Sequence, residues 1–149
     1  MRDAVYTQLL LADDDKDDCD LFKDALSELS ITANLTIVND GEQLMQFLSG
    51  EKAQLPGMIF LDLNMPRKNG FECLSEIKSS PLLRHLPVII FSTSFDRDIV
   101  NLLYINGANF YISKPNEFEK LKAVIRHALS AISKNMDRQP DHENFVIYP

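Results

Sequence analysis

Short apolar segments alternate with amphipathic segments along the chain, and each apolar segment ends on polar residues. The apolar segments are four to six residues long and rich in Val, Ile, Leu and Phe, which is typical of buried strands. We expect five strands, at residues 8–12, 35–38, 58–63, 88–91 and 109–112.

Helical periodicity follows every predicted strand. Apolar residues recur at spacings of three and four, which predicts amphipathic helices. They are expected over roughly residues 17–29, 44–48, 71–77, 99–105 and 116–132. A strand followed by a helix five times requires a parallel sheet with right-handed crossovers and helices on both faces. The predicted fold is therefore α/β, a doubly wound five-stranded parallel sheet in three α/β/α layers.

Ionisable and hydroxyl side chains lie near the carboxyl ends of four predicted strands. They are Asp13 and Asp14 after the first strand, Asp62 at the end of the third, Ser92 after the fourth and Lys114 after the fifth. In an open parallel sheet these strand ends share one edge, and ligands bind beside it. We therefore expect these residues to converge on one site.

Three neighbouring carboxylates repel one another, by about 4 kcal/mol for each pair at about 4 Å and an effective dielectric near 20. A cation relieves this repulsion, and Mg²⁺ prefers oxygen ligands of this kind. A metal ion and the Lys114 ammonium beside a nucleophilic Asp62 would suit acceptance of a phosphoryl group. The Ser92 hydroxyl could then donate a hydrogen bond to that group.

Composition narrows the class of protein. The chain has 149 residues, of which 45% are hydrophobic and 25% charged, as in one ordinary globular domain. The net charge of −7 argues against nucleic-acid binding, and no apolar run approaches the roughly 20 residues that span a bilayer. We expect a cytoplasmic protein in which Cys19 and Cys73 are packing residues in a reduced compartment.

Four segments together resemble the receiver domain of two-component response regulators. They are LLLADDD, IFLDLNMPRKNG, IIFSTS and FYISKP, in that order, and the resemblance covers about residues 8–133. It implies the flavodoxin-like strand order 2-1-3-4-5 and a role in phosphorelay signalling. The long acidic run, the STS segment and the C-terminal extension resemble the single-domain regulators associated with phytochromes.

The resemblance implies that Asp62 accepts a phosphoryl group from a sensor histidine kinase or a phosphotransfer protein. It also implies an Mg²⁺ (or Mn²⁺) site. Asp14 and Asp62 would bind the metal through their side chains, Asn64 through its backbone carbonyl, and Asp13 through water. The chain would catalyse only its own phosphorylation and slow dephosphorylation, so it is not expected to be an enzyme.

The resemblance also implies a conformational switch. Lys114 would contact the phosphoryl group, and the pair Ser92 and Tyr111 would respond to it, the hydroxyl moving toward the phosphate and the ring turning inward. The side chains of Asn64 and Ser94 occupy positions that tune dephosphorylation. The peptide bond between Lys114 and Pro115 is expected to be cis, an isomer that is accessible before proline.

The chain is expected to divide into a receiver domain, residues 1–133, and a C-terminal extension, residues 134–149. The extension is polar at first and ends in the apolar segment Phe145-Val146-Ile147-Tyr148-Pro149. We expect that segment to pack against the sheet edge of its own domain or across a partner in a homodimer. A downstream protein is the expected target of the switch.

Other interpretations of the same residues stay open. A haloacid-dehalogenase-like phosphohydrolase also uses a strand-end Asp, Mg²⁺ and a lysine, but it needs a second Asp where this chain has Asn64. A pseudo-receiver would bind partners without phosphorylation. Locally, Asp17 and Asp18 are expected to be solvated acids at a helix start, Ser94 is expected to cap the fourth helix, and Tyr111 could be only a half-buried strand aromatic.

Overall fold

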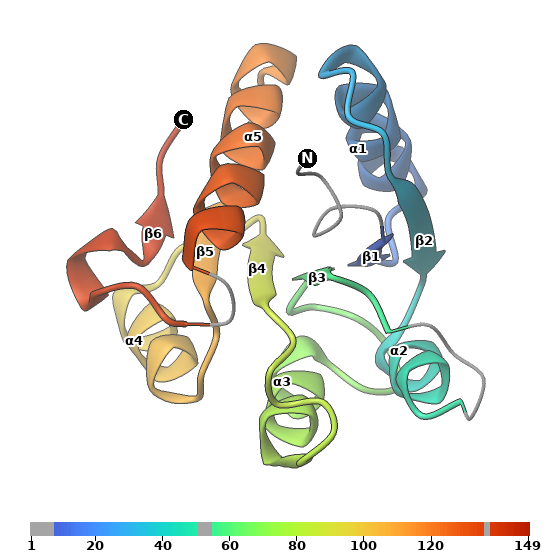
Figure 1. Ribbon diagram of the computed structural model, residues 1–149, viewed down its shortest axis with the longest axis vertical. Helices are drawn as coiled ribbons and strands as arrows, with labels where there is room; N and C mark the ends of the chain where they lie inside the picture. Colours follow the sequence, from blue (N-terminus) through green and yellow to red (C-terminus); the bar gives the residue numbers. More distant parts are fainter. Residues whose placement is uncertain (1–7, 51–54, 136–137) are drawn as a thin grey trace.

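A parallel sheet runs through the middle of the molecule, in the strand order β2-β1-β3-β4-β5-β6 (Figure 1). A computed structural model describes residues 8–50, 55–135 and 138–149. The strands in those ranges are β1 Gln8–Ala12, β2 Asn34–Val38, β3 Met58–Leu61, β4 Val88–Ser92, β5 Phe110–Ser113 and β6 Val146–Ile147. The predicted order of the first five strands is confirmed. The predicted strand number is corrected, because the end of the chain adds a sixth.

Helices cover both faces of this sheet, as predicted (Figure 1). Helices α1 Lys16–Glu28 and α5 Phe118–Asn135 lie on one face, and α2 Gly41–Leu48, α3 Gly70–Ser79 and α4 Arg97–Ile105 lie on the other. Alternate residues of β1 enter the two cores. Leu9 and Leu11 pack toward α1 and α5, and Leu10 and Ala12 pack toward α2 and α3. This division is what a central strand buried on both faces requires.

The first four helices each begin after an Asp or Asn whose side chain accepts backbone N–H bonds. These N-caps are Asp15, Asp40, Asn69 and Asp96. The prediction that Ser94 caps α4 is wrong, because the Asp96 carboxylate accepts from the N–H of Asp98 at 2.9 Å and from that of Ile99 at 3.3 Å. Ser94 lies in the preceding loop, where its carbonyl accepts a hydrogen bond from the Tyr111 hydroxyl.

The peptide bond between Lys114 and Pro115 is trans, so the predicted cis isomer is wrong. Trans is the lower-energy isomer even before proline, by about 0.5–1 kcal/mol. The pairing of β5 with β4 ends just before this bond: Ser92 pairs with Ser113, and the Lys114 N–H donates to the Ser92 carbonyl at 2.7 Å.

Both cysteines are buried packing residues, as predicted. Cys19 lies on α1 and Cys73 on α3. Burial raises the pKa of each thiol to about 11, so both stay protonated and unreactive near neutral pH.

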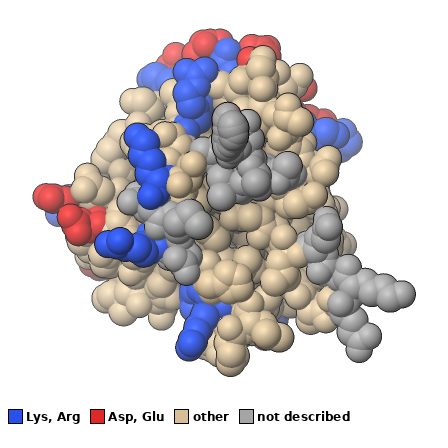
Figure 2. Space-filling view, in the orientation of Figure 1, with Lys and Arg blue, Asp and Glu red and all other residues tan. Residues whose placement is uncertain are grey.

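The surface carries scattered cations. Figure 2 shows lysine and arginine side chains spread singly over one face, while acidic side chains gather at the upper and left margins. Of the helices described, none has both the length and the apolar character needed to cross a bilayer.

The end of the chain lies along the outer edge of β5. Strand β6 pairs with β5 in parallel, with Val146 opposite Tyr111. The Tyr111 N–H donates to the Phe145 carbonyl at 3.0 Å. β6 and the short 3₁₀ helix before it, His142–Asn144, lie between α4 and α5 (Figure 1). The tail thus extends the sheet of its own chain.

Side-chain contacts anchor this tail to α4. Phe145 is 1% exposed and Ile147 is 3% exposed. The Phe145 ring meets the Tyr104 ring edge-on, with 5.1 Å between centroids. The Tyr104 hydroxyl donates to the Pro140 carbonyl at 2.8 Å, and the Gln139 amide donates to the Tyr104 carbonyl at 2.6 Å. The apolar end of the tail is therefore part of the core.

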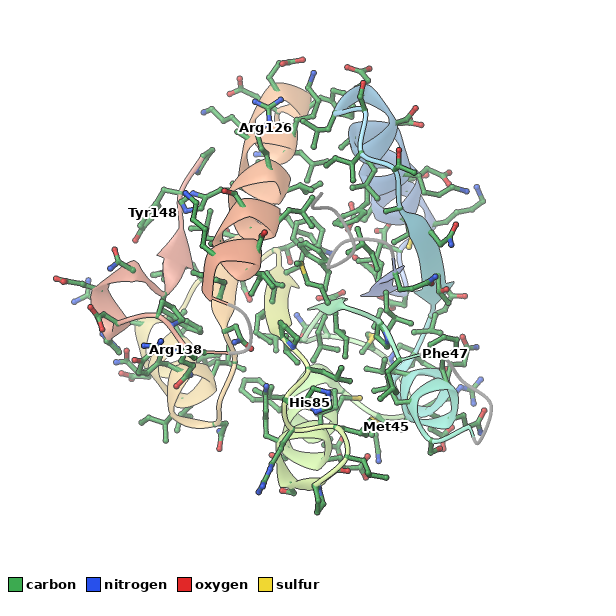
Figure 3. The ribbon with its side chains drawn as sticks, in the orientation of Figure 1. Met45, Phe47, His85, Arg126, Arg138 and Tyr148 are labelled. Atoms are coloured by element: carbon green, nitrogen blue, oxygen red, sulfur yellow. The ribbon has the colours of Figure 1, made fainter. Side chains whose placement is uncertain are left out.

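Phe145→Ala is expected to lower the free energy of unfolding by about 3 kcal/mol, because the substitution leaves a cavity where a buried ring was. Tyr148→Ala is the matched control. Tyr148 is 70% exposed and lies on the outside of the tail (Figure 3), so its loss should change stability by about 0.5 kcal/mol or less. Urea unfolding measures both, and equal effects of the two substitutions would contradict the docked tail.

Candidate functional site

Two neighbouring strands bring acidic residues together at one edge of the sheet. β1 and β3 pair in parallel with Ala12 opposite Leu61, so Asp13 and Asp62 come next on each strand, side by side. The Asp62 N–H donates to the Ala12 carbonyl at 3.0 Å. One carboxylate oxygen from each of Asp13, Asp14 and Asp62 lies within 4.8 Å of the others. These three acids therefore lie close together, as the sequence predicts.

The loop after β3 folds back tightly over Asp62. The Gly70 N–H donates to the Leu63 carbonyl at 2.9 Å. A Cβ atom at Gly70 would lie 2.3 Å from the Asp62 carbonyl oxygen, so only glycine fits there. The Asn64 N–H points to Asp62 Oδ1 at a distance of 3.4 Å, while the Asn64 side chain is exposed. This loop fixes the direction of the Asp62 carboxylate.

Burial makes negative charge costly in this group. Asp13 is 0% and Asp62 is 6% exposed, whereas Asp14 is open to solvent. Burial raises the pKa of Asp62 from 3.8 to about 6; the charge of Lys114 opposes the shift, and those of Asp13 and Asp14 add to it. Burial likewise raises the pKa of Asp13, against the hydrogen bond from Lys114. The site therefore favours the arrival of positive charge.

Lys114 supplies one such charge. Its ammonium nitrogen lies 2.8 Å from Asp13 Oδ2, 2.8 Å from Asp18 Oδ2 and 3.6 Å from Asp62 Oδ2. The side chain is only 9% exposed. Burial alone would lower the pKa of Lys114, but the hydrogen bonds to Asp13 and Asp18 raise it above its ordinary value, so the group stays an ammonium.

Asp18 is the one member of this cluster that sequence reasoning missed. The sequence predicts a solvated acid at a helix start, but the Asp18 carboxylate binds Lys114 across 96 positions of sequence. Asp17 is exposed, in line with the prediction. The position of Asp18 in the sequence could have indicated this contact. Asp18 lies in the first turn of α1, and that turn follows β1 at the same sheet edge as the other acids.

Ser92, Ser94 and Tyr111 form a second group beside the acids. Ser92 is fully buried, and its Oγ lies 3.5 Å from the Ser94 Oγ. The Tyr111 ring is 1% exposed and meets the Phe95 ring edge-on, with 5.8 Å between centroids. This group is joined to the acidic one by the bond from the Lys114 N–H to the Ser92 carbonyl. Tyr111 is thus fully buried, which goes beyond the half-buried aromatic weighed from the sequence.

The donor set fits a divalent cation. Asp13, Asp14 and Asp62 offer carboxylate oxygens, the ligands that Mg²⁺ and Mn²⁺ prefer. Burial raises the pKa of Asp13 and of Asp62 even with Lys114 beside them, so negative charge stays costly in this group. A cation at this edge would supply the missing charge.

Comparison with known proteins gives a consistent result. The family model described as the response regulator receiver domain matches residues 9–126. Response regulator Rcp1 from Synechocystis sp. is 35% identical over 122 residues, which cover 79% of this chain and 83% of that protein.

Two solved structures are similar throughout. The phosphorylated cyanobacterial phytochrome response regulator RcpA has 31% identity and a TM-score of 0.78, over 91% of this chain and 99% of that one. The Mn²⁺-bound form of response regulator Rcp1 has 33% identity and a TM-score of 0.76, over 89% and 99% of the two chains.

The buried acid makes stability depend on pH. The folded-state pKa of Asp62, about 6, exceeds its ordinary value of 3.8. The contribution of this carboxyl to stability is therefore complete below about pH 4 and is lost as the pH rises through about 6. Asp62→Asn, which cannot ionise, is expected to raise the stability of the metal-free protein at about pH 7 by on the order of 2 kcal/mol.

Urea unfolding with a chelator present, at about pH 7 and about pH 4, tests this expectation. The advantage of Asp62→Asn should shrink at the lower pH. Asp17→Asn removes an exposed carboxylate and should show no comparable gain. If Asp62→Asn is no more stable than the wild type at about pH 7 and at about pH 4, the ionised Asp62 carboxylate does not destabilise the folded protein, and the expectation is refuted.

Proposed function

We propose that this chain, which belongs to the response regulator receiver family of two-component phosphorelay signalling, accepts a phosphoryl group on Asp62. The observation that carries the proposal is the group of three carboxylates with the Lys114 ammonium at one edge of a doubly wound sheet. A nucleophilic carboxylate beside fixed positive charge suits phosphoryl transfer, which depends on positioning and charge neutralisation.

The donor is proposed to be a phosphohistidine on a sensor histidine kinase or a phosphotransfer protein. An Asp62 carboxylate oxygen would form the new bond to phosphorus as the P–N bond of the phosphohistidine breaks. With a pKa of about 6, the Asp62 carboxylate is mostly ionised at neutral pH and available for attack. Similarity to phytochrome response regulators supports a kinase of the phytochrome type.

The metal is proposed to be Mg²⁺, with Mn²⁺ as the alternative. Similarity to the Mn²⁺-bound form of response regulator Rcp1 supports a divalent metal at this site. Asp14 and Asp62 would hold it through their carboxylates, Asn64 through its carbonyl and Asp13 through water. When bound, it would neutralise charge on the acceptor and on the phosphoryl oxygens. Lys114 would contact the phosphoryl group from the other side.

Ser92 and Tyr111 are proposed to carry the signal. The Ser92 hydroxyl would move to a phosphoryl oxygen, and the ring of Tyr111 would stay packed inward, where it already contacts the loop of Ser94 and Phe95. Asn64 and Ser94 would tune the lifetime of the phosphoryl group.

A phosphohydrolase is disfavoured because Asn64 cannot act as the general acid–base that such enzymes use. The intact acceptor Asp62 and the intact Lys114 disfavour a pseudo-receiver.

The output is proposed to be control of a protein partner by docking, without turnover of any other substrate. The face formed by α4, β5 and α5 is already partly covered by the tail. A partner there would meet the tail together with the exposed Leu102 and Ile105 of α4. Nucleic acid is a poor partner for a chain of charge −7. The two free, buried thiols support a cytoplasmic location.

Incubation with acetyl phosphate and Mg²⁺ is expected to label the wild type with one acid-labile phosphoryl group per chain. Asp62→Asn should take up none, and Lys114→Ala should be labelled at least about a hundredfold more slowly. Radioactive or mass-spectrometric detection measures all three. Labelling of Asp62→Asn to the wild-type level would contradict the proposal, and repeated turnover of a phosphate ester would favour the hydrolase.

A homodimer through the end of the tail is not expected, because Phe145 and Ile147 are buried within their own chain. Deletion of residues 145–149 should leave the molar mass per particle unchanged in light scattering, apart from the residues removed. Circular dichroism would verify that the shortened chain folds. A fall from dimer to monomer on deletion would show that the tail joins two copies.

A further inference from the structure

We propose that Asp18 is a positioning residue for the Lys114 ammonium, and this rests on the proposed phosphorylation of Asp62. Asp18 would hold the ammonium near the acceptor carboxylate without letting the two bind directly. Two observations carry the inference: the contacts of Lys114 and the local geometry at the start of α1.

The Lys114 ammonium has three partners at unequal distances. Asp13 and Asp18 each accept from it at 2.8 Å, while Asp62 Oδ2 lies at 3.6 Å. The bonds to Asp13 and Asp18 come from different elements, the end of β1 and the first turn of α1. Together they fix the nitrogen at the end of a long, flexible side chain. The distance to Asp62 allows attraction but is too long for a direct hydrogen bond.

The Asp18 carboxylate is not occupied by its own helix. An acid at the third position of a helix often reaches back to the N–H of the N-cap, as Glu72 does to Asn69 in α3. In α1 the Asp15 N–H is already bonded to Asp13 Oδ1 at 2.9 Å. Asp18 receives its own cap bond through its backbone N–H, at 3.1 Å from Asp15 Oδ1. Its side chain is therefore left to bind Lys114.

Removal of Asp18 would change which carboxylate the ammonium prefers. Asp13 would stay bonded at 2.8 Å, and Asp62 Oδ2, 3.6 Å away, would be the next carboxylate to take the place that Asp18 leaves. A direct bond from Lys114 to Asp62 would tie up an oxygen of the nucleophile and shift the ammonium from the place of the incoming phosphoryl oxygens. Both effects slow the transfer of the phosphoryl group. Neither is expected to weaken the binding of a small phosphoryl donor.

The test compares Asp18→Ala and Asp18→Glu with the control Asp17→Ala, which removes an exposed acid of the same charge from the same helical turn. Labelling by acetyl phosphate with Mg²⁺ is measured over a range of donor concentrations. Asp18→Ala should lower the maximal rate roughly tenfold, as for a catalytic group that loses its alignment. The donor concentration at half-maximal rate should stay within about twofold. Asp18→Glu should recover part of the rate, and Asp17→Ala should match the wild type.

A second readout needs no phosphorylation. The ¹H–¹⁵N signal of the Lys114 ammonium persists only while hydrogen bonds protect its protons from exchange with water. It should be seen in the wild type and in Asp17→Ala, and should be lost or shifted in Asp18→Ala. Thermal unfolding would verify that each variant is folded.

The outcomes separate two failures. A wild type that takes up no phosphoryl group would contradict the proposed function, and the role of Asp18 would fall with it. A labelled wild type whose rate and ammonium signal match those of Asp18→Ala would overturn the role of Asp18 alone. A slower Asp18→Ala with an unchanged ammonium signal would also overturn it, because the effect would not pass through Lys114.

Discussion

The ion pair between Lys114 and the buried acids is the interaction on which the site depends. Two carboxylates, those of Asp13 and Asp62, are buried at the carboxyl edge of the sheet, at 0% and 6% exposure, where their charges are poorly solvated. The lysine compensates part of this charge from 2.8 Å at Asp13 and 3.6 Å at Asp62. Burial still raises the pKa of both acids above its ordinary value. Uncompensated negative charge of this kind favours the binding of a cation.

The sheet holds this arrangement in place. β1 and β3 are central strands covered on both faces, and their pairing sets Asp13 beside Asp62. β4 and β5 bring Ser92 next to the residue before Lys114. The tail adds a further restraint, because its Phe145 carbonyl accepts the N–H of Tyr111 on the outer edge of β5. The candidate switch residue is thus held by β4 on one side and by the tail on the other.

Much of this arrangement follows from the sequence, for identifiable reasons. Continuous apolar segments predict the central strands, and strand order alone brings Asp13, Asp14, Asp62 and Lys114 to one edge. Short or competing signals account for what was missed. β6 has only two residues, too few to show periodicity. Asp96 and Ser94 are both good caps, and only the path of the chain decides between them.

The role of Asp18 could not be predicted from the sequence. Its sequence neighbours, Asp17 and Asp20, are exposed acids, and nothing in composition or spacing sets it apart. What distinguishes it is the direction of its side chain toward a lysine 96 positions away. The bond before Pro115 is trans, in line with the local preference of such bonds, whereas the expected cis isomer came from the family resemblance alone.

Asp62 is proposed to carry the phosphoryl group. Borohydride converts an aspartyl phosphate to homoserine and so marks the modified position permanently. After incubation with acetyl phosphate and Mg²⁺, peptide mass spectrometry should find homoserine at position 62 and at no other aspartate. Homoserine at position 13, 14 or 18 in place of position 62, or none in a protein that is folded and binds the metal, would contradict the proposed role of Asp62.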